Sequence, residues 1–137
     1  MKKLFVFIHL LSYLFNQTVE IESGLFQENS YLQNESVYFN VQIENTGSMT
    51  LSGLWINVDI SDPNSTNVIE GLWQYIPTLN PNETYETGYD YIWTVPANAT
   101  LGNYSAAIGL RDIFNVYDIE YSTDNFNIIA SENLFPL

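Results

Sequence analysis

The fold of this chain is constrained most by the strict alternation of apolar and polar side chains in residues 36–47, Ser-Val-Tyr-Phe-Asn-Val-Gln-Ile-Glu-Asn-Thr-Gly. Successive side chains of an extended strand point to opposite faces, so the apolar members of this run share one face. They are Val37, Phe39, Val41 and Ile43. The closing Asn-Thr-Gly favours a turn. We therefore predict a strand with one buried and one solvated face.

Six further runs follow the same pattern and are separated by residues that favour turns, namely Gly, Pro and Asn. They are residues 18–22, 54–60, 68–76, 85–95, 104–110 and 117–129. No stretch has a convincing helical period, and cysteine is absent. An all-β fold is expected, specifically an immunoglobulin-like antiparallel β-sandwich of about seven strands without a disulfide.

Two of these runs carry specific expectations. In residues 85–95 one face holds the densest aromatic stripe of the chain, and we expect it to line the core because its strand offers no other apolar face. Its members are Tyr85, Thr87, Tyr89, Tyr91, Trp93 and Val95. In residues 117–129 the apolar face changes parity, which a bulge near Asp124–Asn125 would reconcile. A second bulge or bend is expected at Gly24.

The N-terminus combines two lysines with twelve nearly all apolar residues, 4–15. This pattern is typical of a secretory signal peptide, which we place at residues 1–17. A helix of twelve residues reaches about 18 Å, short of the roughly 30 Å of a bilayer core. A core helix or a short membrane anchor is the alternative. The sandwich then covers residues 18–129, and residues 130–137 form a C-terminal tail.

Charge narrows the range of partners. The chain has 16 acidic and 3 basic residues, and removal of the leader leaves Arg111 as the one cation, for a formal charge of −15. Such a protein repels phosphate backbones and anionic lipid headgroups, which argues against nucleic-acid binding and peripheral membrane binding. The leader predicts an extracellular or cell-surface location.

Six Asn-x-Ser/Thr triplets suit a secreted glycoprotein, since about two or three would arise by chance at this composition. One, at Asn16, lies in the leader. The predicted N-glycosylation sites of the mature chain are Asn34, Asn64, Asn82, Asn98 and Asn103. Compositional bias toward Asn, Ser and Thr is the alternative explanation for any single triplet.

A family resemblance rests on four segments in order: residues 36–47, Ile-Pro-Thr-Leu-Asn-Pro-Asn-Glu-Thr at 76–84, Trp-Thr-Val-Pro at 93–96 and Leu-Gly-Asn-Tyr-Ser at 101–105. Together they resemble the CARDB-like group, which are cell-adhesion-related immunoglobulin-like modules of bacterial and archaeal surface proteins. Asn82 stands where that family usually has glycine. The resemblance implies a non-catalytic extracellular module used in adhesion or assembly, and it transfers no site residues.

The mature chain has few candidate catalytic side chains, because it would lack Cys, His and Lys. A glycosidase-like pair such as Asp90 with Asp59 is formally available, but no insertion forms a cleft around it. Oxygen ligands for calcium crowd around one turn, at Asp59, Asp62, Asn64 and Ser65, without EF-hand spacing, and an acidic turn is the simpler interpretation. No catalytic residue, metal or cofactor is therefore expected.

Exposed aromatic residues suggest a carbohydrate-binding alternative, in which Trp55 and Trp73 form a coplanar stacking face. Arg111 is expected to form a hairpin salt bridge with a neighbouring carboxylate. The apolar tail, 130–137, either packs on its own domain or is disordered, or else adds as a strand to a neighbouring subunit. Our interpretation is a non-catalytic secreted or cell-surface module for protein–protein interaction, adhesion or assembly, which acts through edge strands or the tail on an envelope protein or itself.

Overall fold

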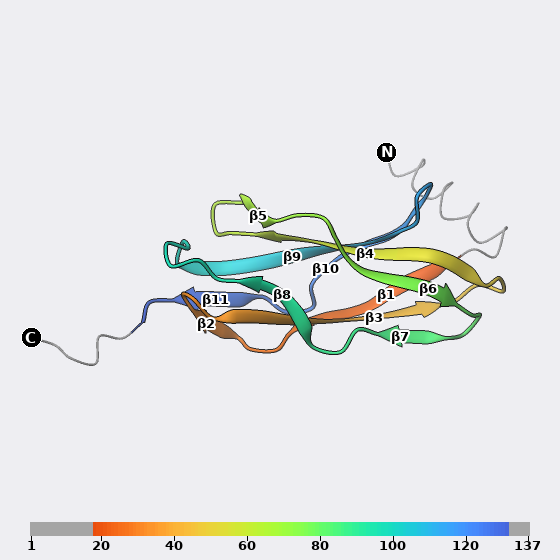
Figure 1. Ribbon diagram of the computed structural model, residues 1–137, viewed down its shortest axis with the longest axis horizontal. Helices are drawn as coiled ribbons and strands as arrows, with labels where there is room; N and C mark the ends of the chain where they lie inside the picture. Colours follow the sequence, from red (N-terminus) through yellow and green to blue (C-terminus); the bar gives the residue numbers. More distant parts are fainter. Residues whose placement is uncertain (1–17, 132–137) are drawn as a thin grey trace, which may run out of the picture.

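The computed structural model describes residues 18–131, which form eleven strands in two packed sheets (Figure 1). The predicted leader, including Asn16, and residues 132–137 of the predicted tail lie outside the described residues. No helix between residues 18 and 131 is long and apolar enough to cross a membrane.

The first sheet is built around β3 (Ser36–Asn45), which pairs antiparallel with every other strand of the sheet. Its partners are β1 (Val19–Phe26), β7 (Thr84–Glu86) and β8 (Asp90–Thr94). The alternation of β3 is confirmed, since all four apolar side chains of its inner face are 0% exposed. The predicted half-buried strand is thus the centre of one layer.

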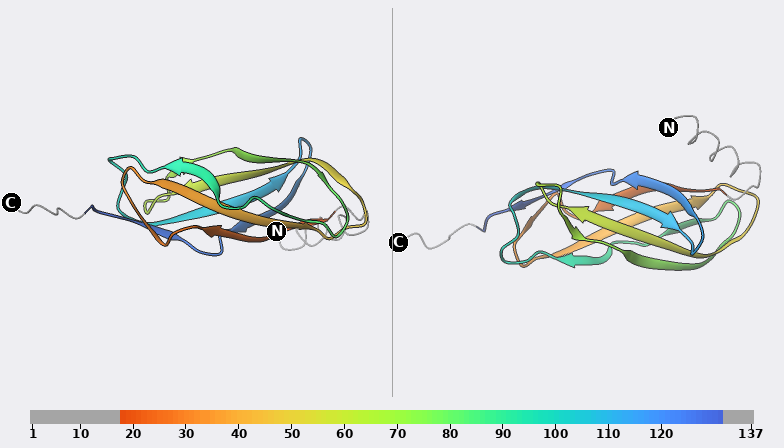
Figure 2. Two further views of the ribbon diagram at one scale, coloured as in Figure 1. Left: turned by 60° about the horizontal axis from the view of Figure 1, so that its bottom comes forward. Right: turned by 90° about the horizontal axis from the view of Figure 1, so that it is seen from above.

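The second sheet contains the seven remaining strands, with β9 and β4 as its central pair. Figure 2 shows these two strands side by side with β10. The pairings are antiparallel apart from β2 with β11, which is parallel. The strands are β2 (Ser30–Leu32), β4 (Leu51–Ser61), β5 (Asn67–Ile69), β6 (Leu72–Leu79), β9 (Gly102–Arg111), β10 (Val116–Tyr121) and β11 (Phe126–Ile129).

The core lies between the sheets and is filled by alternate side chains of both, as in other β-sandwiches. Each of Leu54, Ile56, Val58 and Ile60 on β4 is 0% exposed. Aromatic rings join the layers toward the end where β11 lies. Phe26 contacts Phe39 and Phe126 with centroids 4.5 Å apart. The predicted immunoglobulin-like sandwich is therefore confirmed.

The number of strands exceeds the predicted seven because three predicted runs are split, two of them at a glycine and the run 117–129 at residues 122–125. The run 68–76 breaks at Gly71 (φ 122°), which separates β5 from β6. The run 85–95 breaks at Gly88 (φ 67°), which separates β7 from β8. Both glycines adopt a backbone conformation that other residues rarely take. The strand β2 was also missed, because its segment reads as a polar connection.

The second break overturns the expectation of a continuous aromatic core stripe. Both ends of the stripe face the core, since Tyr85 is partly buried against it and Trp93 is 7% and Val95 0% exposed. Tyr89 and Tyr91 are about half exposed. The alternation changes face at the Gly88 break and changes back at the register shift in β8, where Trp93 pairs with Val37 but Tyr91 pairs with Tyr38. A two-residue period therefore cannot be extended over the whole run.

The two predicted bulges have different outcomes. The register of β1 shifts between Ile21 and Ser23, two residues before Gly24. Gly24 itself is paired, and it is glycine because a Cβ there would lie 2.2 Å from Ile108 Cδ1. The second bulge, predicted near Asp124–Asn125, is not found, because a break at residues 122–125 separates β10 from β11 instead. This break does not turn the apolar side chains of β10 into the core, and Ile119 is 66% exposed.

Candidate functional site

The hairpin of β9 and β10 turns through the four residues 112–115, and its conformation follows from the aspartate at its start. Asp112 Oδ1 accepts hydrogen bonds from the amides of Phe114 (2.7 Å) and Asn115 (2.6 Å). The Asp112 amide donates to the carbonyl oxygen of Asn115 at 2.9 Å. An aspartate that bonds the amide two residues on is a typical turn former. The two central residues of the turn, Ile113 and Phe114, therefore extend their side chains into solvent.

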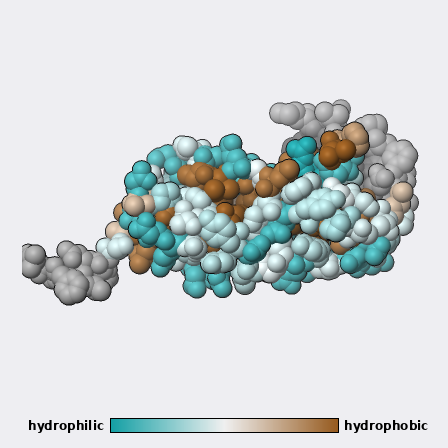
Figure 3. Space-filling model, viewed as in Figure 1, coloured by the Kyte–Doolittle hydropathy of each residue, from teal (hydrophilic) through white to brown (hydrophobic). Residues whose placement is uncertain are grey.

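These two side chains begin a continuous exposed apolar surface. Ile113 is 76% and Phe114 84% exposed at the tip. On β10 the register sets Val116 opposite Arg111, Ile119 opposite Gly109 and Tyr121 opposite Ala107, all on the outer face of the sheet. We call this set the hairpin surface: Ile113, Phe114, Val116, Ile119 and Tyr121. Figure 3 shows hydrophobic side chains at the tip of the β9–β10 hairpin.

The hairpin surface is anchored from beneath by Tyr117. The Tyr117 hydroxyl donates to Asp112 Oδ2 at 2.7 Å, while its ring is half-buried against the core. Burial and then the hydrogen bond and charge of Asp112 raise the pKa of Tyr117 to about 12. Burial favours the neutral form of Asp112, but the Tyr117 hydroxyl and the two turn amides outweigh it and lower the pKa of Asp112. The turn is therefore held by mutually supporting hydrogen bonds.

Carboxylates of β10 and of the neighbouring strand β1 lie beside the hairpin surface. Asp118 Oδ2 accepts the Ile21 amide at 2.9 Å and so joins β10 to the edge of β1. Across β1, Glu22 is exposed, and its pKa is raised by desolvation and then by the charges of Glu44, Glu20 and Asp118. Negative charge thus accumulates beside an apolar surface, and this combination distinguishes the hairpin end of the molecule.

The two tryptophans proposed as a sugar-binding face do not lie together. Trp55 is on the outer face of β4, with its ring 4.9 Å from the half-exposed Tyr75 and tilted by 48°. Trp73 packs inward, with its ring 5.9 Å from Phe39, a core residue. Its Nε1 donates to the carbonyl oxygen of Tyr91 at 3.0 Å. Trp73 therefore closes the gap between β6 and β8, the edge strands of the two sheets.

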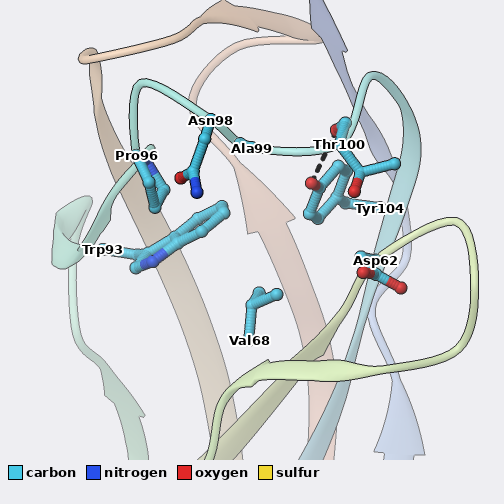
Figure 4. Close-up of a pocket in the computed structure, with 8 residues that line it drawn as sticks. All are labelled: Asp62, Val68, Trp93, Pro96, Asn98, Ala99, Thr100 and Tyr104. Atoms are coloured by element: carbon cyan, nitrogen blue, oxygen red, sulfur yellow. Dashed lines mark hydrogen bonds between the residues drawn. The ribbon is translucent and has the colours of Figure 1, made fainter.

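A hollow of about 310 Å³ lies at the other end of the sandwich, where the β4–β5 and β8–β9 connections meet (Figure 4). Its floor is formed by Trp93 and Tyr104, and its rim by Pro96, Asn98 and Asp62. The Tyr104 hydroxyl donates to the carbonyl oxygen of Thr100 at 2.7 Å, and burial raises the pKa of Tyr104, with a smaller effect of Asp62. The hollow therefore has aromatic side chains beneath a polar rim.

All five predicted glycosylation sites of the mature chain fall among the described residues, and each asparagine is exposed. Asn34 and Asn82 adopt positive φ angles of 73° and 63° in their turns. The remaining three, Asn64, Asn98 and Asn103, lie in the β4–β5 and β8–β9 connections and at the start of β9. All five side chains are sterically open to modification.

In the oxygen-rich turn considered for calcium, the carboxylates accept hydrogen bonds from nearby backbone amides. Asp62 Oδ1 accepts the amides of Asn64 and Thr66, and Asp59 Oδ1 accepts the amide of Gly71. Gln74 Nε2 donates a hydrogen bond to Asp90 Oδ2 at 2.5 Å across the sheets, so Asp90 is paired with an amide and not with Asp59. Between residues 18 and 131, no three Asp, Glu, His or Cys side chains are grouped to hold a metal ion.

Arg111 differs from the expectation of a hairpin salt bridge. Its Nε donates to the backbone carbonyl oxygen of Asp112 at 3.3 Å. The Asp112 carboxylate is already engaged by Tyr117 and the turn amides. Arg111 lies exposed on the outer face of β9, paired with Val116 on one side and Trp55 on the other. It is therefore a cation within the largely apolar outer face at the hairpin end.

The chain matches no protein-family model and no curated protein. Solved structures with a similar fold include a β-glucosidase involved in saponin metabolism from intestinal bacteria (13% identity, TM-score 0.54), which aligns with 82% of this chain. The chain spans only 16% of that enzyme. The C-terminal domain of wzt aligns over 86% of this chain and 76% of its own length, with 9% identity and a TM-score of 0.57.

A CARDB domain from Pyrococcus furiosus aligns over 84% of this chain and 94% of its own length, with 17% identity and a TM-score of 0.48. At sequence identities this low, the similarity shows a shared fold and nothing about function. The sandwich is established by the strand pairing and by the matches with TM-scores above 0.5. The two-sheet β-sandwich is thus the feature that this chain shares with these structures.

Proposed function

We propose that this CARDB-like sandwich is a secreted or cell-surface, non-catalytic module that binds another protein through its hairpin surface. The observation that carries the proposal is the exposure of five large apolar side chains on one hairpin, from 56% for Val116 to 84% for Phe114. Contiguous exposed apolar surface is uncommon on soluble monomers and marks interaction sites. The hydrogen bonds of Asp112 hold this surface in one conformation, which lowers the entropic cost of binding.

Charge complementarity indicates the chemistry of the partner. The hairpin surface is flanked by Asp118 and by the carboxylates of β1 and β3, and the whole chain carries 16 acidic against 3 basic residues. A second copy would bring the same excess of negative charge. The partner that fits is an extracellular protein whose apolar side chains are bordered by lysine or arginine.

Site-specific photo-crosslinking of the full chain in its host tests the proposal. A photoreactive residue replaces Phe114 in one variant and Tyr38 in the control, because Tyr38 is exposed on the opposite sheet. We expect a cross-linked extracellular protein from position 114 alone, and its capture should weaken as ionic strength rises. The Ile113→Ser/Phe114→Ser variant should fold normally and bind this protein at least ten-fold more weakly.

Three results would contradict the proposal. Equal cross-linking from both positions would mean that the hairpin surface is not the contact. Cross-linking to a second copy, with dimers in light scattering, would identify a self-assembling module instead. Unchanged affinity of the double variant for the cross-linked protein would remove the apolar contact from the mechanism.

A further inference from the structure

Four of the five described N-glycosylation triplets converge on one end of the sandwich, although they are spread over seventy residues of sequence. Asn34 lies in the β2–β3 connection, Asn64 in the β4–β5 connection, Asn98 in the β8–β9 connection, and Asn103 at the start of β9. Figure 1 shows these connections together at the left. We call this the loop end; it is opposite the hairpin surface.

Direct contacts join the connections that carry the four asparagines. The side chain of Gln33 donates from Nε2 to the carbonyl oxygen of Ala99 at 3.2 Å, which joins the segments of Asn34 and Asn98. Pro63 packs against Gly102, so the neighbours of Asn64 and Asn103 are also in contact. The hollow, which both Asp62 and Asn98 line, connects these two pairs of segments at the same end of the sandwich.

The other end of the molecule is different. Among the described residues it carries a single triplet, at Asn82 in the turn between β6 and β7. It also carries the hairpin tip, with no acceptor between residues 104 and 131. A bulky, hydrated glycan there would hinder close contact, whereas at the loop end it would leave the hairpin surface free.

The hollow of the loop end lies directly beside one acceptor. Asn98 is on its rim, and Figure 4 shows the Asn98 side chain pointing down toward the Trp93 indole. The volume of about 310 Å³ is at the lower limit of pockets that hold small molecules, about 300–1,000 Å³. The indole offers an apolar face and the rim offers hydrogen-bonding groups, which suits the first sugar of a glycan.

We propose that the loop end is a glycosylated end, with N-linked glycans on Asn34, Asn64, Asn98 and Asn103, and that the first sugar of the Asn98 glycan sits in the hollow over Trp93. Glycans at the loop end do not require a partner at the hairpin surface. They make the two ends of the molecule different, because one end is covered by glycans and the other exposes apolar side chains.

The modification requires a lipid-linked saccharide and the oligosaccharyltransferase of the host. The side-chain amide nitrogen of the asparagine forms a bond to C1 of the first sugar. The bond from C1 to the lipid phosphate breaks, the lipid phosphate leaves with the bonding electrons, and the amide loses one proton. The Ser or Thr two residues on identifies the acceptor.

Glycopeptide mapping of the full chain, secreted from an N-glycosylating host, tests the first half of the proposal. We expect all four loop-end asparagines to carry glycan. Asn98→Gln and Thr100→Ala should each remove one glycan mass, because either change destroys the same triplet, while Thr100→Ser should keep it. Unmodified asparagines at the loop end would overturn the proposal.

Trimming with an endoglycosidase that leaves only the first sugar tests the second half. The trimmed wild-type protein should melt at a higher temperature than the trimmed Asn98→Gln variant, because only the former has a sugar against Trp93. The matched control, Asn64→Gln, loses a sugar away from the hollow and should not lower the melting temperature. Equal melting temperatures for trimmed wild type and Asn98→Gln would show that no sugar occupies the hollow.

Discussion

The indole nitrogen of Trp73 donates a hydrogen bond to the carbonyl oxygen of Tyr91 at 3.0 Å, and this bond joins the edge strand β6 of one sheet to the edge strand β8 of the other. The ring of Trp73 continues inward to Phe39 at the centre of the first sheet. One side chain thus closes the long edge of the sandwich. Such a contact also covers strand edges that would otherwise be open to pairing.

Replacing Trp73 should therefore weaken the sandwich in two separable steps. Trp73→Phe removes the hydrogen bond and should cost about 1 kcal/mol of the free energy of unfolding. Trp73→Ala also removes the partly buried ring and should cost about 2–3 kcal/mol, less than for a fully buried tryptophan. Urea unfolding measures both, and Trp55→Phe on the outer face is the control. A Trp73→Ala protein as stable as the control would contradict this role.

Gly24 should not tolerate a side chain unless its neighbour is shortened. A Cβ at Gly24 would lie 2.2 Å from Ile108 Cδ1 and 2.9 Å from Phe39 Cζ. Gly24→Ala should cost about 1–3 kcal/mol through overpacking. Ile108→Val removes the clashing methyl group and alone should cost about 0.5–1.5 kcal/mol. In a double-mutant cycle the combined variant should be more stable than the sum of the single losses. Simple additivity would exclude this clash as the cause.

Asn45 is buried and its amide cannot be exchanged for a carboxylate. Its Nδ2 donates to the carbonyl oxygens of Met49 (2.8 Å) and Leu79 (3.0 Å), while Oδ1 accepts the Gly47 amide. In Asn45→Asp an oxygen faces these two carbonyls, so the variant should lose about 3 kcal/mol or more at pH 7. The loss should shrink at low pH, where a protonated carboxyl regains one donor.

Unfolding in urea at pH 4 and pH 7 measures this pH dependence. The control is Asn127→Asp, an exposed position on β11, which should change stability by no more than about 0.5 kcal/mol. An Asn45→Asp variant that is equally destabilised at both pH values would show that charge at this site is not the cause.

The hydroxyl of Tyr117 should make hairpin stability depend on alkaline pH. Because burial and Asp112 raise its folded pKa to about 12 from 10, its contribution is complete below pH 10 and is lost between about pH 10 and 12. The contribution should be about 1 kcal/mol, because Tyr117 is only partly buried and solvent screens its interaction with Asp112. At acid pH the lowered pKa of Asp112 has the opposite sign, and stability falls as Asp112 is protonated.

Ultraviolet titration of the tyrosines, compared between wild type and Tyr117→Phe, measures this behaviour. The wild type should contain one group that ionises near pH 12 and the variant should lack it. Tyr121→Phe serves as control because Tyr121 is 79% exposed. If Tyr117→Phe leaves the alkaline end of the titration unchanged, the Tyr117–Asp112 hydrogen bond does not form in solution.

The local sequence pattern was sufficient to predict a strand and its buried side chains where the strand is central in its sheet and has one buried face. The period of two in residues 36–47 predicts β3 and its core side chains because both neighbours of the strand and the opposite sheet impose the same constraint. The sandwich class follows from repeating that pattern. The local pattern did not predict the change of strand face at Gly88, because that change depends on the conformation of a turn. It also did not predict the exposure of Ile119 and Tyr121, because that exposure depends on the position of β10 at a sheet edge.

The sequence by itself determined the class of fold, the net charge, the inventory of acceptor asparagines and the lack of cysteine. Only the tertiary structure decided which apolar residues remain in water, and that Trp73 lies inside while Trp55 lies outside. It also brought Asn34, Asn64, Asn98 and Asn103 to one end. The physical reason is that composition and period are properties of neighbouring residues, whereas burial and clustering depend on pairings between residues far apart in the chain.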